Sequence, residues 1–169
     1  MLLGSYADDL REAILRIKRP GSEHLAWSLA ALLVEKQQPA LEAIGVDGVV
    51  PVPMHWWRRA WRGTSDADEV ARVLARAIGV GVVPALVRAR ATRMQNELPP
   101  EERGDNVAGA FRVRGDIVGR RLLLVDDVVT TGGTLAECRR ALVAAGASAV
   151  HAAAAARAER AGDARDDDG

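Results

Sequence analysis

The segment LLLVDDVVTTGGTL, residues 122–135, decides the fold of this chain. Its first four residues, 122–125, are all apolar. A strand that is apolar on both faces must be covered on both sides, which is the environment of a parallel sheet in an α/β domain. Two carboxylates, a Thr- and Gly-rich turn and a helical pattern follow in that order. The segment therefore predicts a buried parallel strand that ends in an acidic pair and a loop leading into a helix.

The acidic pair, Asp126 and Asp127, falls where open parallel sheets bind their ligands, beyond the carboxyl end of a strand. Neighbouring residues of an extended strand point to opposite faces, so the two carboxylates are expected to have different roles unless the chain bends there. The alternative is that the pair and the turn after it only cap a helix. Two acids directly after a buried strand favour ligand binding over capping.

The turn after the acidic pair is suited to an anion. Its hydroxyls, its glycines and the N–H groups of the helix start all favour a phosphate. The turn lacks the Lys of a Walker A loop and the G-x-G-x-x-G of a dinucleotide fingerprint. With the acidic pair, it indicates a ligand that carries both hydroxyls and a phosphate. The candidate phosphate-binding residues are Thr130, Thr131, Gly132, Gly133 and Thr134.

The decapeptide VDDVVTTGGT, residues 125–134, resembles the phosphoribosyl pyrophosphate signature of the type I phosphoribosyltransferases. The resemblance implies an α/β fold with a Rossmann-like, mostly parallel sheet flanked by helices and a small hood. It implies that Asp126 and Asp127 hold the ribose 2′ and 3′ hydroxyls and that residues 130–134 hold the 5′-phosphate. Mg²⁺ is the expected cofactor, and because it keeps several waters, the same two carboxylates are expected to bind it indirectly.

Length and composition indicate one soluble domain. The chain has 169 residues, of which 49% are hydrophobic, and its formal net charge is zero. Nothing in the overall charge argues for nucleic acid or an anionic membrane as a partner. With a single cysteine, Cys138, neither a disulfide framework nor a zinc cluster is expected within one chain. The first residues lack a long apolar core, so we expect a cytoplasmic protein without a signal peptide or membrane insertion.

Hydrophobic periodicity divides the chain into one domain, residues 1–157, and a disordered acidic tail, residues 158–169. Helices are expected in residues 5–45: from Ser5 to about residue 19, from Ser22 onward, and again from Pro39. The core is expected to occupy residues 46–157. Its elements are strands at 46–52, 82–87, 111–113 and 148–156, a helix at 67–78, and the central strand and helix described above.

The segment PVPMHWWRRAWRG, residues 51–63, interleaves tryptophan with arginine. Arginine forks match phosphate oxygens, which makes Arg58 and Arg62 candidates for pyrophosphate. Exposed indoles stack on bases, which makes Trp57 and Trp61 candidates for a nucleobase or single-stranded DNA. The alternative is that the tryptophans pack beneath neighbouring elements.

The pattern PVPxHxxRxxxRG in this segment resembles the competence protein F (ComF) branch of the phosphoribosyltransferases. Where that branch continues with Phe-Asn-Gln, this chain has Thr64, Ser65 and Asp66. Positions between Arg90 and Phe111 match the branch again and imply a hood loop at about residues 88–111 that closes over pyrophosphate. Arg90 and Arg103 are the candidates for the leaving group; a solvated surface charge is the alternative for each. The N-terminal zinc ribbon of many relatives is absent from this sequence, so no zinc is expected.

Two functions remain open from the sequence. The first is a Mg²⁺-dependent phosphoribosyltransferase that uses phosphoribosyl pyrophosphate, releases pyrophosphate and acts on an unidentified acceptor. The second is a non-catalytic accessory protein of DNA uptake that binds single-stranded DNA or a phosphoribosyl ligand. Purine-type members of the family carry Asp where this chain has Thr130, which argues against purine salvage. No catalytic residue is assigned, and a homodimer is compatible with either function.

Overall fold

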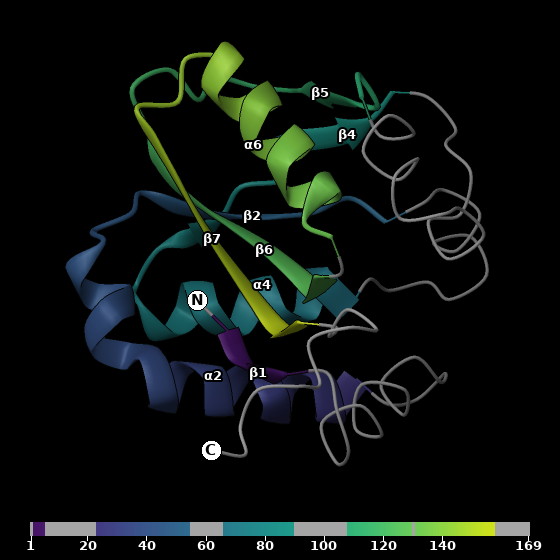
Figure 1. The fold of residues 1–169 in the computed structure, drawn as a ribbon. Helices are drawn as coiled ribbons and strands as arrows, with labels where there is room; N and C mark the ends of the chain where they lie inside the picture. The colour runs from purple at the N-terminus through teal and green to yellow at the C-terminus, as the bar shows by residue number, and fades with distance from the viewer. Residues whose placement is uncertain (1, 6–22, 55–65, 90–107, 130, 158–169) are drawn as a thin grey trace, which may run out of the picture.

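A computed structural model describes residues 2–5, 23–54, 66–89, 108–129 and 131–157 (Figure 1). Three helices and seven strands occupy these ranges. The helices are α2 (Glu23–Ala43), α4 (Asp66–Ala77) and α6 (Gly133–Ala144). The strands are β1 (Leu2–Ser5), β2 (Gly48–Pro51), β3 (Gly81–Val82), β4 (Leu86–Arg88), β5 (Phe111–Val113), β6 (Arg121–Val129) and β7 (Ala149–Arg157).

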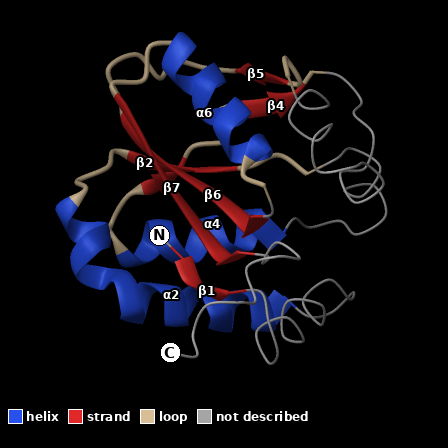
Figure 2. Cartoon of the chain, viewed as in Figure 1, coloured by secondary structure: helices blue, strands red, loops and turns tan. Residues whose placement is uncertain are grey.

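The main sheet has five strands in the order β1-β7-β6-β2-β3, and every neighbouring pair is parallel. A separate antiparallel pair is formed by β4 and β5. Helices lie on both sides of the main sheet (Figures 1 and 2). The face covered by α6 and the β4–β5 pair is called the α6 side, and the face covered by α4 and α2 is called the α4 side. This layered arrangement confirms the predicted α/β fold with a parallel sheet flanked by helices.

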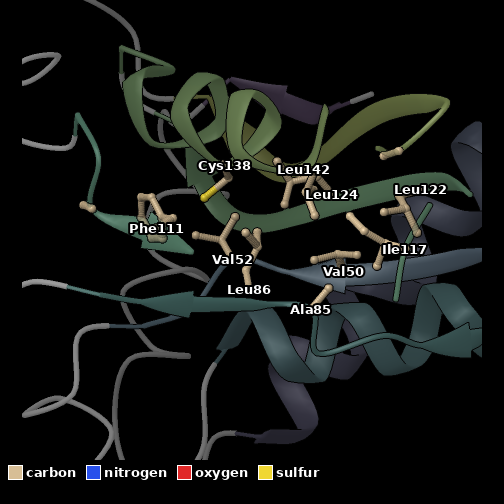
Figure 3. Packing of buried hydrophobic residues seen from close by; sticks show 12 residues of the cluster. Val50, Val52, Ala85, Leu86, Phe111, Ile117, Leu122, Leu124, Cys138 and Leu142 are labelled. Carbon is tan, nitrogen blue, oxygen red and sulfur yellow. The ribbon is translucent and has the colours of Figure 1, made fainter. Parts of the chain in front are cut away.

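The central strand β6 feeds two hydrophobic cores. Leu122 and Leu124 belong to the core on the α6 side, part of which Figure 3 shows. Leu123 and Val125 belong to the core on the α4 side. All four side chains are fully buried. The prediction of a strand covered on both faces is therefore confirmed, and the alternation of faces along β6 follows from the period of two of a strand.

Helix α2 is longer than predicted, because it continues through Pro39 where two helical pieces were expected. Proline inside a helix removes one backbone hydrogen bond and crowds the preceding turn, at a cost of about 3 kcal/mol. Leu41, two residues later, is 1% exposed and belongs to the core on the α4 side. Its burial gives the last turn a packing contact that opposes this cost.

The predicted strand at residues 82–87 was wrong, because this stretch forms two strands in two different sheets. Val82 ends β3 at the edge of the main sheet and is exposed, whereas Leu86 in β4 is buried on the α6 side. Pro84 lies between them and has no N–H to donate to a sheet. Local apolar character could not reveal that the chain changes layers here.

Other boundaries also differ from the prediction. Strand β6 continues through both aspartates to Val129 because it stays paired with β7, up to the partners Val129 and Arg157. Ser5, the predicted N-cap, ends β1, which pairs with β7. The rest of the helix predicted up to residue 19 lies outside the described residues, as does the tail at 158–169. The remaining elements agree with the prediction within two or three residues at their ends, which is close to the usual uncertainty of such boundaries.

Candidate functional site

The strand order creates a switch point between β2 and β6. From β2 the chain passes through α4 to β3 on one side, and from β6 it passes through α6 to β7 on the other. Helices α4 and α6 cover opposite faces of the sheet (Figure 1), so the connections after β2 and β6 diverge. Open α/β sheets bind ligands in the crevice beyond the carboxyl ends of the strands at such a point. The acidic pair near the end of β6 therefore lies at the expected position for a ligand.

The two carboxylates lie on opposite faces of β6. Asp126 continues the face of Leu122 and Leu124 on the α6 side, and Asp127 continues the other face on the α4 side. Both side chains are only partly buried. Their orientations are fixed by the main chain: the amide of Asp127 donates to Asp126 Oδ1 at 2.9 Å, and the amide of Val128 donates to Asp127 Oδ1 at 2.8 Å. The pair therefore approaches a ligand from two directions, which favours a different role for each carboxylate.

The loop after β6 leads directly into α6, and a glycine occupies the N-cap position of this helix. Gly132 is the N-cap residue, with φ 81° in the left-handed region, and as a glycine it has no side chain that could cap the helix. Its carbonyl accepts the amide of Ala136 at 2.9 Å, and Thr131 Oγ1 accepts the amide of Gly133 at 3.5 Å. The first turn of the helix holds no acidic residue. Since helix N-termini attract anions, this loop is suited to a phosphate.

Arg88, which the sequence did not single out, lies close to the site. It ends β4 opposite Phe111 on β5, and its guanidinium carbon is 4.8 Å from the centre of the Phe111 ring. Burial lowers the pKa of Arg88, while its electrostatic interactions with Cys138 and Asp126 act in the opposite direction. A pattern in which Arg88 closes a short apolar strand was the only sequence signal. The pairing with Phe111, 23 positions away, comes from the tertiary structure.

Cys138 is fully buried in the same core on the α6 side (Figure 3). Burial raises the pKa of its thiol, and the nearby charge of Asp126 raises it further. A thiol that does not ionise at neutral pH is neither a good nucleophile nor a good metal ligand. The interpretation of Cys138 as a small buried hydrophobic residue is confirmed.

Glu137 of α6 is the one buried charged residue among those that the structure describes. Its Oε1 accepts the backbone amide of Gly109 at 2.6 Å, and Arg140 donates to both of its oxygens at 2.6 and 2.7 Å. The hydrogen bonds from Arg140 are the main cause of a lowered pKa for Glu137, and burial opposes them. Glu137 thus ties α6 to the chain that follows residues 90–107. Sequence reasoning missed it because its partner is 28 positions away.

The remaining predicted site residues lie outside the part of the chain that the structure describes. The structure does describe the first residues of the Arg/Trp segment. Strand β2 pairs with β6 up to Pro51 and Val125, and the amide of Val52 donates to the carbonyl of Val125 at 2.8 Å. The undescribed part of that segment begins at residue 55, three residues after this backbone contact beside the acidic pair. The residues not described are Arg58, Arg62, Arg90, Arg103, Trp57, Trp61 and Thr130.

Within the described ranges, no three His, Cys, Asp or Glu side chains gather into a metal-binding group. The carboxylates of Asp126 and Asp127 offer hard oxygen ligands of the kind that Mg²⁺ accepts together with water and substrate oxygens. The donor set is therefore compatible with an indirectly bound Mg²⁺. In the same ranges, each helix is too short or too polar to cross a membrane.

Comparison with known proteins points to one family. The model of the phosphoribosyl transferase domain matches residues 62–169. The DNA utilization protein YhgH of Escherichia coli strain K12 is 35% identical over 153 residues, covering 88% of this chain and 67% of that protein. Competence protein F of Haemophilus influenzae is 30% identical over 149 residues, covering 84% of this chain and 65% of that protein. The chain thus spans about two thirds of the length of these relatives.

Solved structures show the same fold. The allosteric regulatory enzyme of purine biosynthesis superposes with a TM-score of 0.59 at 23% identity, covering 86% of this chain and 30% of that one. Glutamine phosphoribosylpyrophosphate amidotransferase from B. subtilis superposes with a TM-score of 0.56 at 24% identity, with the same coverage of both chains. At this level of identity the likeness concerns the fold.

Proposed function

Because this chain belongs to the phosphoribosyl transferase domain family and to its ComF-like branch, we propose that it binds phosphoribosyl pyrophosphate with Mg²⁺ at the carboxyl ends of β2 and β6. In this proposal the acidic pair holds the ribose hydroxyls and the loop before α6 holds the 5′-phosphate. Phosphoribosyl transfer to an acceptor, with release of pyrophosphate, is the proposed reaction.

The observation that carries the proposal is the arrangement of two partly exposed carboxylates and an anion-binding helix start along one continuous strand and loop. Asp126 and Asp127 precede the N-terminus of α6 by only six to seven residues. Hydroxyls of a sugar are suitable donors to carboxylates, and the phosphate of the same sugar is a suitable partner for the N-terminus of a helix. A single phosphorylated pentose has both groups, so one ligand accounts for both features.

Mg²⁺ would supply neutralisation of the pyrophosphate charge when bound. Asp126 and Asp127 are the residues of the described chain that we propose to hold it, through water and substrate oxygens. The same carboxylates orient the ribose, and the loop amides hold its phosphate. In the transfer, the bond from ribose C1 to the pyrophosphate oxygen breaks and a bond from C1 to the acceptor forms, so positioning of the sugar is the main task of these residues.

The decisive test is the affinity for phosphoribosyl pyrophosphate of an Asp127→Asn variant, measured by calorimetry in the presence of Mg²⁺. A hydrogen bond to a charged group contributes about 1.5–3 kcal/mol, so the affinity should fall roughly 10- to 100-fold. Asp116→Asn is the matched control, since Asp116 is exposed in the turn before β6, where its Oδ1 accepts the amide of Val118. An affinity that is unchanged in the Asp127 variant would remove the proposed site.

A second candidate function is a non-catalytic role in DNA uptake, with single-stranded DNA or a phosphoribosyl compound as ligand. The names of the relatives, a DNA utilization protein and a competence protein, favour it, as does the Arg/Trp segment at residues 51–63. Fluorescence titration with single-stranded DNA at several salt concentrations tests it. Alanine variants of Arg58, Trp57 and Trp61 should lose affinity, because phosphate contacts and base stacking each contribute.

The two functions can be separated by one screen. Phosphoribosyl pyrophosphate is offered with a panel of bases and amines while pyrophosphate release is followed, and DNA binding is measured on the same preparation. Turnover with any acceptor supports the transferase. Silence across the panel together with DNA binding that depends on Trp57 and Trp61 supports the accessory role.

A further inference from the structure

We propose that Arg88 is a positioning residue for Asp126: it holds this carboxylate from the α6 side and so sets how tightly the site grips the ribose hydroxyls. The inference rests on the proposed function, because it gives Arg88 a role within the site proposed for phosphoribosyl pyrophosphate. Arg88 is not among the residues that the sequence motifs point to, and it belongs to a different sheet from Asp126.

The first step in the argument is that Arg88 is itself held in place. It pairs directly with Phe111 across the β4–β5 ladder, and its guanidinium lies over the ring of that partner at 4.8 Å. Phe111 is 5% exposed and packs in the core on the α6 side. The Nε atom of Arg88 is buried. A planar guanidinium stacked on a buried ring has a defined plane, which a flexible ammonium group would not have.

The second step is that Asp126 reaches the same place. The core on the α6 side runs along β6 from Leu122 past Leu124 towards Phe111 and Cys138 (Figure 3). Asp126 is the next residue on this face after Leu124, and two residues of a strand span roughly 6–7 Å. The charge of Asp126 also acts on the pKa values of both Arg88 and Cys138, which supports their proximity.

The third step is that Arg88 acts on only one member of the acidic pair. Asp127 lies on the α4 side of β6, so the sheet itself separates it from the β4–β5 pair. Removing Arg88 should therefore leave the orientation of Asp127 and the phosphate loop unchanged. The prediction is specific: the sugar hydroxyls lose affinity and the phosphate does not.

The test compares two probes on the full chain, ribose 5-phosphate and inorganic phosphate, by calorimetry with Mg²⁺. Arg88→Met keeps an apolar stem over Phe111 but removes the charge. We expect its affinity for ribose 5-phosphate to fall about tenfold, the scale of one hydrogen bond to a charged group, with phosphate affinity within about twofold of the unsubstituted chain. Arg112→Met is the matched control, because Arg112 follows Phe111 on β5 and is exposed; both affinities should stay unchanged.

Arg88→Lys and Phe111→Leu provide a second measurement that retains the positive charge and removes the planar stack. Both variants should lose affinity for ribose 5-phosphate, but less than Arg88→Met, and should keep their affinity for phosphate. If Arg88→Met does not fold, these two variants test the positioning role. An equal loss for both probes, or no loss for either, would overturn the positioning role. If the unsubstituted chain bound neither probe, the proposed function itself would fall, and this inference with it.

Discussion

Replacement of Glu137 tests whether a buried carboxylate on α6 holds the chain that returns from residues 90–107. Glu137→Ala removes the hydrogen bond from the amide of Gly109, and a hydrogen bond to a charged group contributes about 1.5–3 kcal/mol. Gly109 is exposed, so water can replace the lost acceptor, and the lower half of that range applies. The pair with Arg140 adds little, because Arg140 is 64% exposed and solvent screens the pair. We expect a loss of about 2 kcal/mol.

Such a loss should be visible in urea unfolding and as a fall in the melting temperature of about 4–8 °C for a chain of this size. Glu137→Gln keeps an oxygen acceptor for Gly109 and removes only the charge, so it should cost about half as much. Arg140→Ala is the control for the exposed ion pair, and it should lower the free energy of unfolding far less than Glu137→Ala.

The difference in free energy of unfolding between the unsubstituted chain and Glu137→Gln should decrease as the pH is lowered. The pKa of Glu137 lies below its ordinary value of 4.5 in the folded protein, chiefly because Arg140 donates hydrogen bonds to it. A lowered folded pKa means that the contribution to stability is present above about pH 4.5 and disappears as the pH falls through the folded value. Glutamine does not titrate, so this difference in free energy of unfolding should be constant near pH 7 and should shrink in acid. The reasoning would be refuted if this difference stayed the same in acid. It would also be refuted if Arg140→Ala lowered the free energy of unfolding as much as Glu137→Ala does.

Two further predictions concern the site. Gly132→Ala should lower the free energy of unfolding by about 1–2 kcal/mol, because its φ of 81° is unfavourable for a residue with a Cβ. The added Cβ would meet nothing closer than Val129 Cγ1 at 4.0 Å, so backbone strain is the only expected cost. Unchanged urea unfolding would contradict this prediction. Cys138 should resist a disulfide reagent in the native protein even at about pH 8, since burial raises its pKa, and should react fully after denaturation; rapid labelling of the folded chain would show that the thiol is accessible.

Much of the fold and of the candidate site could be predicted from the sequence because the signals are local. The apolar run before Asp126 and Asp127 encodes a covered strand, and the Thr/Gly turn encodes a helix start, each within a few neighbouring residues. The alternation of the two carboxylates also follows from the period of a strand alone. These patterns depend on the local backbone geometry of strands and helices, so they can be read from each segment without knowledge of its neighbours in space.

Only the tertiary structure decided which distant segments meet. Pairing with β7 extends β6 to Val129, and the change of layer near Pro84 splits one apolar stretch between two sheets. The electrostatic effect of Asp126 on the pKa of Arg88 links residues 38 positions apart, and it arises because the β4–β5 pair packs in the core on the α6 side. Periodicity in the sequence shows which face of a helix or strand is apolar. The hydrophobic effect has no preferred direction, so an apolar face can pack against any other apolar face. The packing of the whole chain therefore decides which two faces meet.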